Sequence, residues 1–123
     1  MSDWAAIAAQ ARAAREVKAS AGGHTFTLRV PTRHECAQVA HKCGAQGNLL
    51  LLQRALLEAA IVGWEGPRLR DVLPEAEDAP LEWAAQGVPL LLDARPEWED
   101  VLNLALVDAL NDRQARAKAA AGN

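Results

Sequence analysis

The chain has 123 residues, enough for one domain with a hydrophobic core but too few for two full-sized domains. Half of the residues are apolar and 24% are charged, a composition typical of a folded protein and not of a disordered one. The 13 basic and 16 acidic residues give a net charge of -3, so the chain has no overall positive field to attract nucleic acid.

Residues 2–19 are rich in alanine and other good helix formers, and Ser2 or Asp3 is placed to cap their start. We therefore predict a helix here. Its apolar groups are mostly methyls, so it would bury little area. We expect residues 1–22 to form a helical arm outside the core, with a frayed tail as the alternative.

Residues 24–30 (HTFTLRV) follow two glycines and alternate polar with apolar side chains, which is the pattern of a half-buried strand. A strand needs a partner for its backbone hydrogen bonds. We expect that partner to be residues 68–73 or the sheet edge of another chain.

Two helices are predicted next. Thr32 and Glu35 have the spacing of a capping box, which indicates a helix from Thr32 to about Cys43. Residues 49–62 are almost uniformly apolar, so we expect a second helix that is covered on most of its sides. The turn-rich residues 63–67 (GWEGP) should end it.

The rest of the chain predicts a surface loop at residues 68–82, a short helix at 83–94 and a last helix that Pro96 opens. Its acidic first turn and basic end suit the helix dipole. One face of this last helix is expected to be buried, and it carries Trp98, Val101, Leu102, Ala105, Leu106, Ala109 and Leu110.

The predicted fold is therefore mainly α. It is a compact bundle of about four helices with one short N-terminal strand, alone or in a small hairpin, and an alanine-rich N-terminal helical arm. We assign residues 23–112 to a single domain and residues 113–123 to a basic, frayed tail.

His34, Cys36, His41 and Cys43 are residue types that zinc prefers. On a helix, however, the two histidines point to one side and the two cysteines to the other. The two histidines lie about 10 Å from each other along the helix axis, and so do the two cysteines. We therefore expect no metal site. The cysteines should form a buried stripe with Val39 and Ala40, with both histidines exposed.

No catalytic or cofactor site is predicted. The only serines, Ser2 and Ser20, lie in the alanine-rich segment, so a serine triad is not expected. An enzyme built on Cys36 or Cys43 with His24 stays open as an alternative, although both cysteines fall on the predicted apolar face, which disfavours a thiolate. Neither glycine motif fits a phosphate-binding loop, because Gly22-Gly23 precedes a strand instead of linking a strand to a helix, and GWEGP (63–67) lacks the lysine and the hydroxyl residue.

The cysteines and the apolar runs of the sequence indicate in which compartment we expect the protein. Two cysteines without other extracellular character suit a reducing cytoplasm. A transmembrane helix needs about 20 consecutive apolar residues, and charged or polar residues interrupt each apolar run, so we expect no membrane association.

From His24 onward, four short segments follow one another in the sequence: FTLRVPT (26–32), IVGWEG (61–66), PLEW (80–83) and LLDARPEW (91–98). Their order resembles that in the small tail assembly chaperones of long-tailed bacteriophages. In those families a short strand precedes helices, a Gly-Trp pair follows an apolar helix, and a Leu-Leu-Asp stretch precedes the last helix. The resemblance covers roughly residues 24–112.

The resemblance implies a virion assembly factor in the host cytoplasm. Such a protein binds the long helical tape measure protein, or another helical protein, and keeps it soluble during tail assembly. It often forms homo-oligomers. The alternatives are a small phage or bacterial regulatory or inhibitor protein that binds a host protein, and a structural tail or connector component.

The apolar residues around Trp64 and Trp83 are more numerous than a small core needs, and they form either a well-filled core or a binding face. Trp64 stands between glycines that allow another backbone to approach, as interface anchors often do, so core and interface both stay open for it. The predicted partner-binding residues are Leu57, Ile61, Gly63, Trp64, Leu81 and Trp83.

Overall fold

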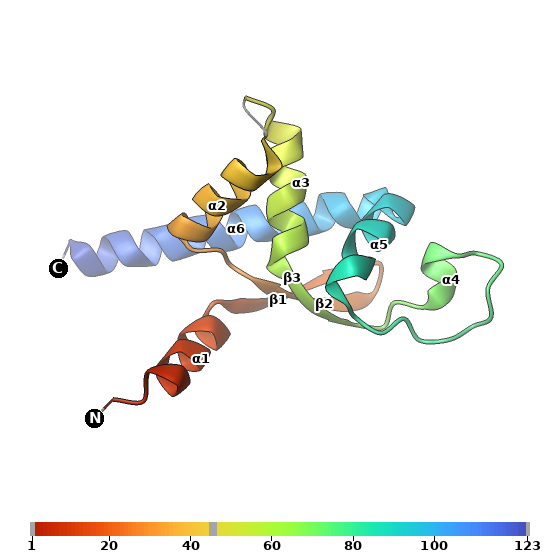
Figure 1. The fold of residues 1–123 in the computed structure, drawn as a ribbon, viewed down its shortest axis with the longest axis horizontal. Coiled ribbons are helices and arrows are strands. Elements are labelled where there is room, and N and C mark those ends of the chain that lie inside the picture. Colours follow the sequence, from red (N-terminus) through yellow and green to blue (C-terminus); the bar gives the residue numbers. More distant parts are fainter. Residues whose placement is uncertain (1, 45–46, 123) are drawn as a thin grey trace.

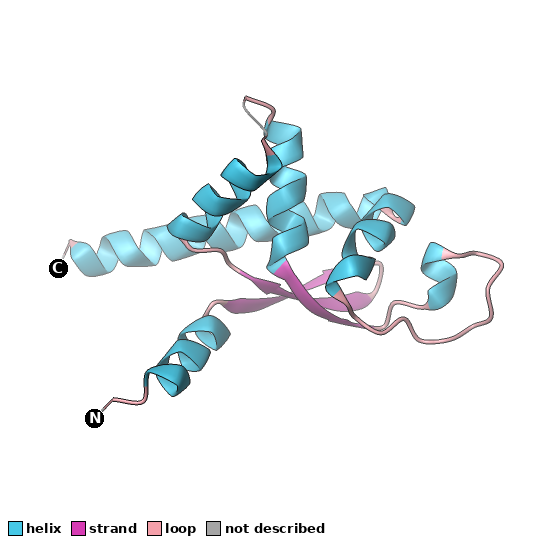
Figure 2. Cartoon of the chain, in the orientation of Figure 1, coloured by secondary structure: helices cyan, strands magenta, loops and turns pink. Residues whose placement is uncertain are grey.

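The structure is a computed structural model that describes residues 2–44 and 47–122. These residues form six α-helices, one 3-10 turn (Ala85–Gly87) and a three-stranded antiparallel sheet (Figures 1 and 2). In chain order the elements are α1 (Trp4–Ala14), β1 (Glu16–Ala21), β2 (His24–Arg29), α2 (Arg33–Cys43), α3 (Leu49–Ala60), β3 (Ile61–Glu65), α4 (Leu69–Val72), α5 (Val88–Ala94) and α6 (Pro96–Ala121). The prediction of a mainly α bundle with one strand was therefore wrong, because the fold is mixed α and β.

The sheet has the strand order β1-β2-β3, with β2 in the centre. β1 and β2 form a hairpin in register from Glu16 opposite Arg29 to Ala21 opposite His24. Its two-residue turn, Gly22-Gly23, has positive φ at both positions, which glycine adopts without strain. The partners of β2 are thus β1 and β3, and the expected pairing with residues 68–73 was wrong.

The second half of the predicted helical arm is a strand, β1. The helix α1 ends at Ala14, and the following residues alternate between exposed and covered positions, with Val17, Ala19 and Ala21 on the covered side. Alanine favours a helix by intrinsic propensity, but pairing with β2 decides the conformation here. Of the predicted arm, α1 alone projects from the fold (Figure 1).

The predicted helix at 49–62 also ended too late, and the expected turn at 63–67 was wrong in its first half. α3 stops at Ala60, and Ile61 begins β3. Trp64 of this strand lies opposite Phe26 of β2. Two consecutive β-branched residues, Ile61 and Val62, suit a strand more than a helix end. The register shifts between Thr27 and Leu28, a β-bulge typical of a strand that bends.

The remaining helices follow the predictions more closely. The capping box of Thr32 and Glu35 is present at the start of α2, and the left-handed Gly44 ends the helix. Pro96 opens α6 as expected, but the helix continues to Ala121, so the tail predicted at 113–123 is helical over most of its length. Alanine, arginine and lysine in that segment are all strong helix formers.

The core lies where α3, α5 and α6 meet one face of the sheet. α3 rises from the sheet and α6 runs behind it (Figure 1). Phe26 and Leu28 of β2 are fully buried, and they form one cluster with side chains from all three helices. The helical members of the cluster are Leu57, Ala60, Val88, Leu91, Leu92, Trp98, Leu102 and Leu106.

The hairpin turn packs directly beneath Trp98. A Cβ atom on Gly22 would lie 2.2 Å from Trp98 Nε1, whereas one on Gly23 would meet nothing within 4 Å. Gly22→Ala should therefore lower the free energy of unfolding by about 2 kcal/mol, through backbone strain and overpacking together. Gly23→Ala is the matched control with strain alone, and should cost about 1 kcal/mol. Equal losses in urea unfolding would contradict this packing.

Arg15 joins α1, the sheet and α2. It is only 8% exposed, and its guanidinium donates hydrogen bonds to Val30 O (3.0 Å) and to Glu35 Oε1. The hydrogen bond from the Thr32 backbone N–H lowers the pKa of Glu35 below its ordinary value. The hydrogen bond and the charge of Arg15 lower it further, and together they outweigh partial burial of the carboxylate.

A carboxyl group with a depressed pKa stabilises the fold above its unfolded-state pKa of about 4.3, and this contribution is lost as the pH falls through the folded pKa. Glu35→Gln keeps an oxygen for the capping box but removes the charge. At pH 7 it should cost about 1 kcal/mol, the scale of one hydrogen bond to a charged group at a half-exposed site. Unfolding at pH 7 and pH 3 should show the difference from wild type shrinking in acid. A difference that stays constant with pH would contradict the prediction.

Candidate partner-binding surface

The structure separates the six residues predicted to bind a partner. Leu57 and Ile61 are fully buried, because the end of α3 and the start of β3 face the core. They therefore cannot contact a partner in this fold. Gly63, Trp64 and Leu81 are half-buried, and Trp83 is 38% exposed.

Trp64 ties the long loop after β3 to the sheet. Its indole N–H donates a hydrogen bond to Leu81 O (2.7 Å), and its ring packs edge-on against Phe26 at 6.1 Å. Backbone hydrogen bonds from Leu81 N to Pro67 O and from Leu69 N to Ala79 O close the base of the same loop. Trp64 thus has a clear packing role, while a direct role in binding stays a prediction.

The arrangement offers little for metal binding or covalent catalysis. Over residues 2–44 and 47–122, no three His, Cys, Asp or Glu side chains gather as metal ligands. His34 and His41 are exposed, and the predicted buried stripe of α2 is only half-buried. Burial, together with the Glu35 charge, raises the pKa of Cys36, which disfavours a reactive thiolate.

The structure does not bring His24 next to Cys36. His24 begins β2 and packs edge-on against Trp98 at 5.1 Å, whereas α2 follows the other end of that strand. A strand of six residues spans about 20 Å. A Cys-His pair of this kind is therefore not assembled.

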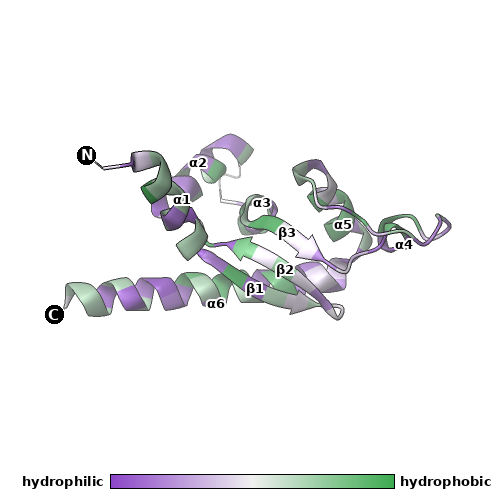
Figure 3. Ribbon diagram, turned by 90° about the horizontal axis from the view of Figure 1, so that it is seen from below, coloured by the Kyte–Doolittle hydropathy of each residue, from purple (hydrophilic) through white to green (hydrophobic). Residues whose placement is uncertain are grey.

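What the structure does present is apolar surface on helices. Among the described residues, the large hydrophobic side chains that stay exposed gather mainly on three helices. These are Trp4 and Ile7 of α1, Leu49, Leu50 and Leu51 of α3, and Val101, Leu104 and Val107 of α6; Leu73, Trp83 and Leu90 lie elsewhere. Figure 3 shows hydrophobic residues along both α1 and α6. These exposed side chains on helices are the candidate partner-binding surfaces.

The first turn of α3 is one of these surfaces. Asn48 caps the helix by accepting a hydrogen bond from Leu51 N (3.2 Å). Leu49 and Leu50 are 71% and 77% exposed, because the helix stands out from the sheet and only its C-terminal half is covered. The expectation that this helix is covered on most sides was wrong.

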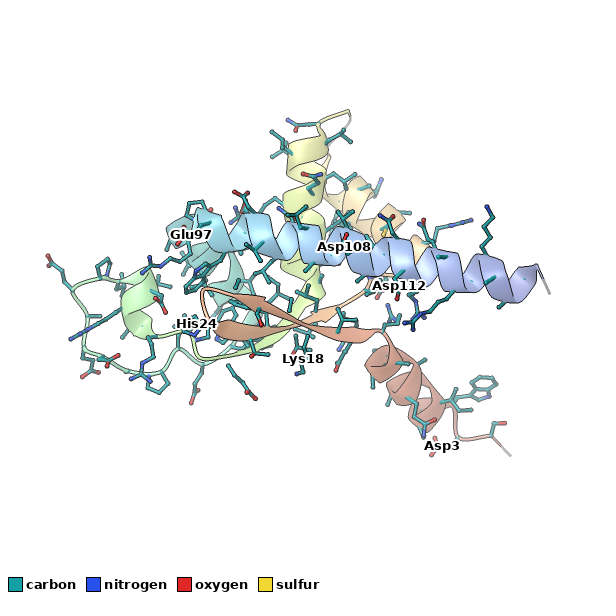
Figure 4. The ribbon with its side chains drawn as sticks, turned by 180° about the vertical axis from the view of Figure 1, so that it is seen from behind. Asp3, Lys18, His24, Glu97, Asp108 and Asp112 are labelled. Atoms are coloured by element: carbon teal, nitrogen blue, oxygen red, sulfur yellow. The ribbon has the colours of Figure 1, made fainter. Side chains whose placement is uncertain are left out.

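We call Val101, Leu104 and Val107 the outer α6 face. They are 45%, 67% and 43% exposed, while Trp98, Leu102 and Leu106 fill the core from the opposite side of the helix. In the view of Figure 4, α6 is the element nearest the viewer, with Glu97 near its start and Asp108 near its middle. The sequence prediction had placed Val101 on the buried face. Leu104 and Val107 lay outside that predicted face, and they could have indicated from the sequence that α6 has a second apolar side.

Arg54 fixes the angle between the helices that carry these surfaces. From α3, its guanidinium donates to Glu99 of α6 (2.6 Å) and to Asp93 (2.7 Å) and Pro89 O (3.0 Å) of α5. It also pairs with Glu58 within α3 (3.1 Å). Burial alone would lower the pKa of Arg54, but the hydrogen bond to Asp93 and the surrounding carboxylate charges raise it. The three helices therefore present their outer sides in one defined arrangement.

Comparison with known proteins adds no assignment: no protein-family model, curated protein or solved structure matches the chain. Within the described ranges, the helices are too short or too polar to span a lipid bilayer. The candidate surface is therefore described from the structure of this chain alone.

Proposed function

We propose that this protein is a non-enzymatic phage tail assembly chaperone, which binds the tape measure protein in the host cytoplasm and keeps it soluble until the tail assembles. The observation that supports the proposal is the outer α6 face, a row of exposed apolar side chains on one helix. The resemblance of the short segments between residues 24 and 112 to tail assembly chaperones points the same way.

The proposed mechanism is removal of apolar surface from water. A long helical protein that waits for its tube exposes apolar stripes, which would otherwise associate with one another. An exposed row on one helix can pack against such a stripe in the manner of helix-to-helix recognition. Each Å² of apolar surface covered in this way is worth about 25 cal/mol. No covalent step is involved.

Co-expression with the tape measure protein that the proposal implies, a long helical protein, tests the proposal. The wild-type chain should move that protein from the pellet to the soluble fraction and co-purify with it. Leu104→Ser should reduce the soluble yield, whereas Gln114→Ser, an exposed position on the same helix, should not. If the long protein stays insoluble with wild type, or if Leu104→Ser performs equally well, the proposed function is wrong.

A further inference from the structure

The outer α6 face has the spacing of a helix-docking stripe. At about 100° per residue, Val101, Leu104 and Val107 lie within an arc of about 120°, and Leu104 points about 160° away from the buried Leu102. Six residues of helix span about 9 Å, close to two turns of a partner helix. The stripe is therefore long enough for one helix to pack along it.

Acidic side chains share the same arc. Glu97, Asp100 and Asp108 are all exposed there, and α6 contains no lysine or arginine before Arg113. In the part of the chain that the structure describes, neither Asp100 nor Asp108 forms an ion pair, and Glu97 makes only a long, exposed contact of 3.8 Å with Arg95. These negative charges are thus available to a partner.

The wider charge distribution has the same sign. Residues 71–100 contain nine acidic residues and a single basic one, Arg95, whereas the rest of the chain contains seven acidic and twelve basic residues. The ion pair between Arg95 and Asp71 (3.3 Å) places the start of this acidic segment beside the start of α6. Asp78, Asp93 and Glu99 of this segment pair with Arg68 and Arg54 from outside it. The negative charge that should speed the approach of a positively charged partner is therefore that of the exposed Asp100 and Asp108.

We propose that the outer α6 face docks a basic amphipathic helix, whose apolar residues cover Val101, Leu104 and Val107 and whose flanking lysines or arginines pair with Asp100 and Asp108. This inference rests on the proposed function, in which a helical protein is the partner. An acidic helix would bring like charges together and is excluded by repulsion.

The probe for the test is a designed helical peptide of 21 residues with leucine at heptad positions a and d and lysine at e and g, compared with the same peptide carrying glutamate at e and g. Fluorescence anisotropy with the full chain should show binding of the lysine peptide only. The Kd should rise about tenfold in Leu104→Ser and in the double variant Asp100→Asn with Asp108→Asn. Asp3→Asn with Glu65→Gln removes two exposed acidic charges elsewhere and should leave the Kd unchanged.

Three results would overturn the inference. Equal binding of both peptides would remove the charge selectivity, and loss of binding in the aspartate variant but not in Leu104→Ser would mean diffuse attraction without docking. A wild-type dimer that Leu104→Ser dissociates would assign the face to a second copy. The peptide assay does not involve the tape measure protein, so a failure of the proposed function in co-expression is recognised separately.

Discussion

Trp98→Ala should lower the free energy of unfolding by about 4 kcal/mol, the range for truncating a core aromatic residue. Trp98 is 7% exposed and lies at the point where α6 meets the hairpin. Its ring packs edge-on against His24 (5.1 Å) and Phe26 (6.1 Å), and the Arg95 guanidinium lies 5.5 Å from its centroid. The truncation leaves a cavity that a turn, a strand and a helix border together, so local collapse cannot fill it.

Urea unfolding followed by circular dichroism measures this loss. Trp83→Ala is the matched control, because Trp83 is 38% exposed and lies in the loop region before α5. It should change the free energy of unfolding by less than about 1 kcal/mol. If both variants lose the same stability, Trp98 does not hold α6 to the hairpin as described.

Arg54→Met should cost about 3 kcal/mol. Methionine fills much of the same volume, but it leaves Glu58, Asp93 and Glu99 facing one another without the cation that neutralises them. Removing one partner of a buried ion pair costs about 3 to 5 kcal/mol. The lower end applies because these pairs are only partly buried, with 26% of the Arg54 side chain and 69% of the Asp93 side chain exposed. The variant should also loosen the angle between α3, α5 and α6.

A double variant separates repulsion from lost packing. Glu99→Gln in the Arg54→Met background should recover part of the lost stability, whereas the same change in wild type should be destabilising. Arg116→Met removes an exposed pair with Asp112 and should cost less than about 0.5 kcal/mol. Additive effects of Arg54→Met and Glu99→Gln would show that the carboxylates do not interact through Arg54.

Local signals in the sequence predicted the elements that local chemistry determines. The capping box at Thr32 and the proline at 96 each set a helix start correctly, because the deciding contacts lie within one turn. β1 was missed because its alanines favour a helix when considered alone. The strand exists only through its ladder with β2 and its contact with α6, which no local pattern contains.

The candidate surface was predictable only in kind. Excess apolar residues indicated a binding protein, but which of them stay outside depends on tertiary packing. Leu57 and Leu50 belong to the same apolar run, and one is fully buried whereas the other is 77% exposed. On α6 the sequence has apolar residues on two sides, and the core uses only the side of Leu102. The other side becomes visible as a surface only after the sheet is placed.

The contact between Trp98 and the turn at Gly22 has a consequence for synthesis. The hairpin leaves the ribosome early, but the ring that covers its turn is translated about 75 residues later, a separation characteristic of slow, non-local folding. Until α6 emerges, Phe26 and Leu28 have no complete cover, and the nascent chain exposes strand edges and apolar side chains together. The core side chains of the hairpin therefore stay exposed until the last helix has been translated.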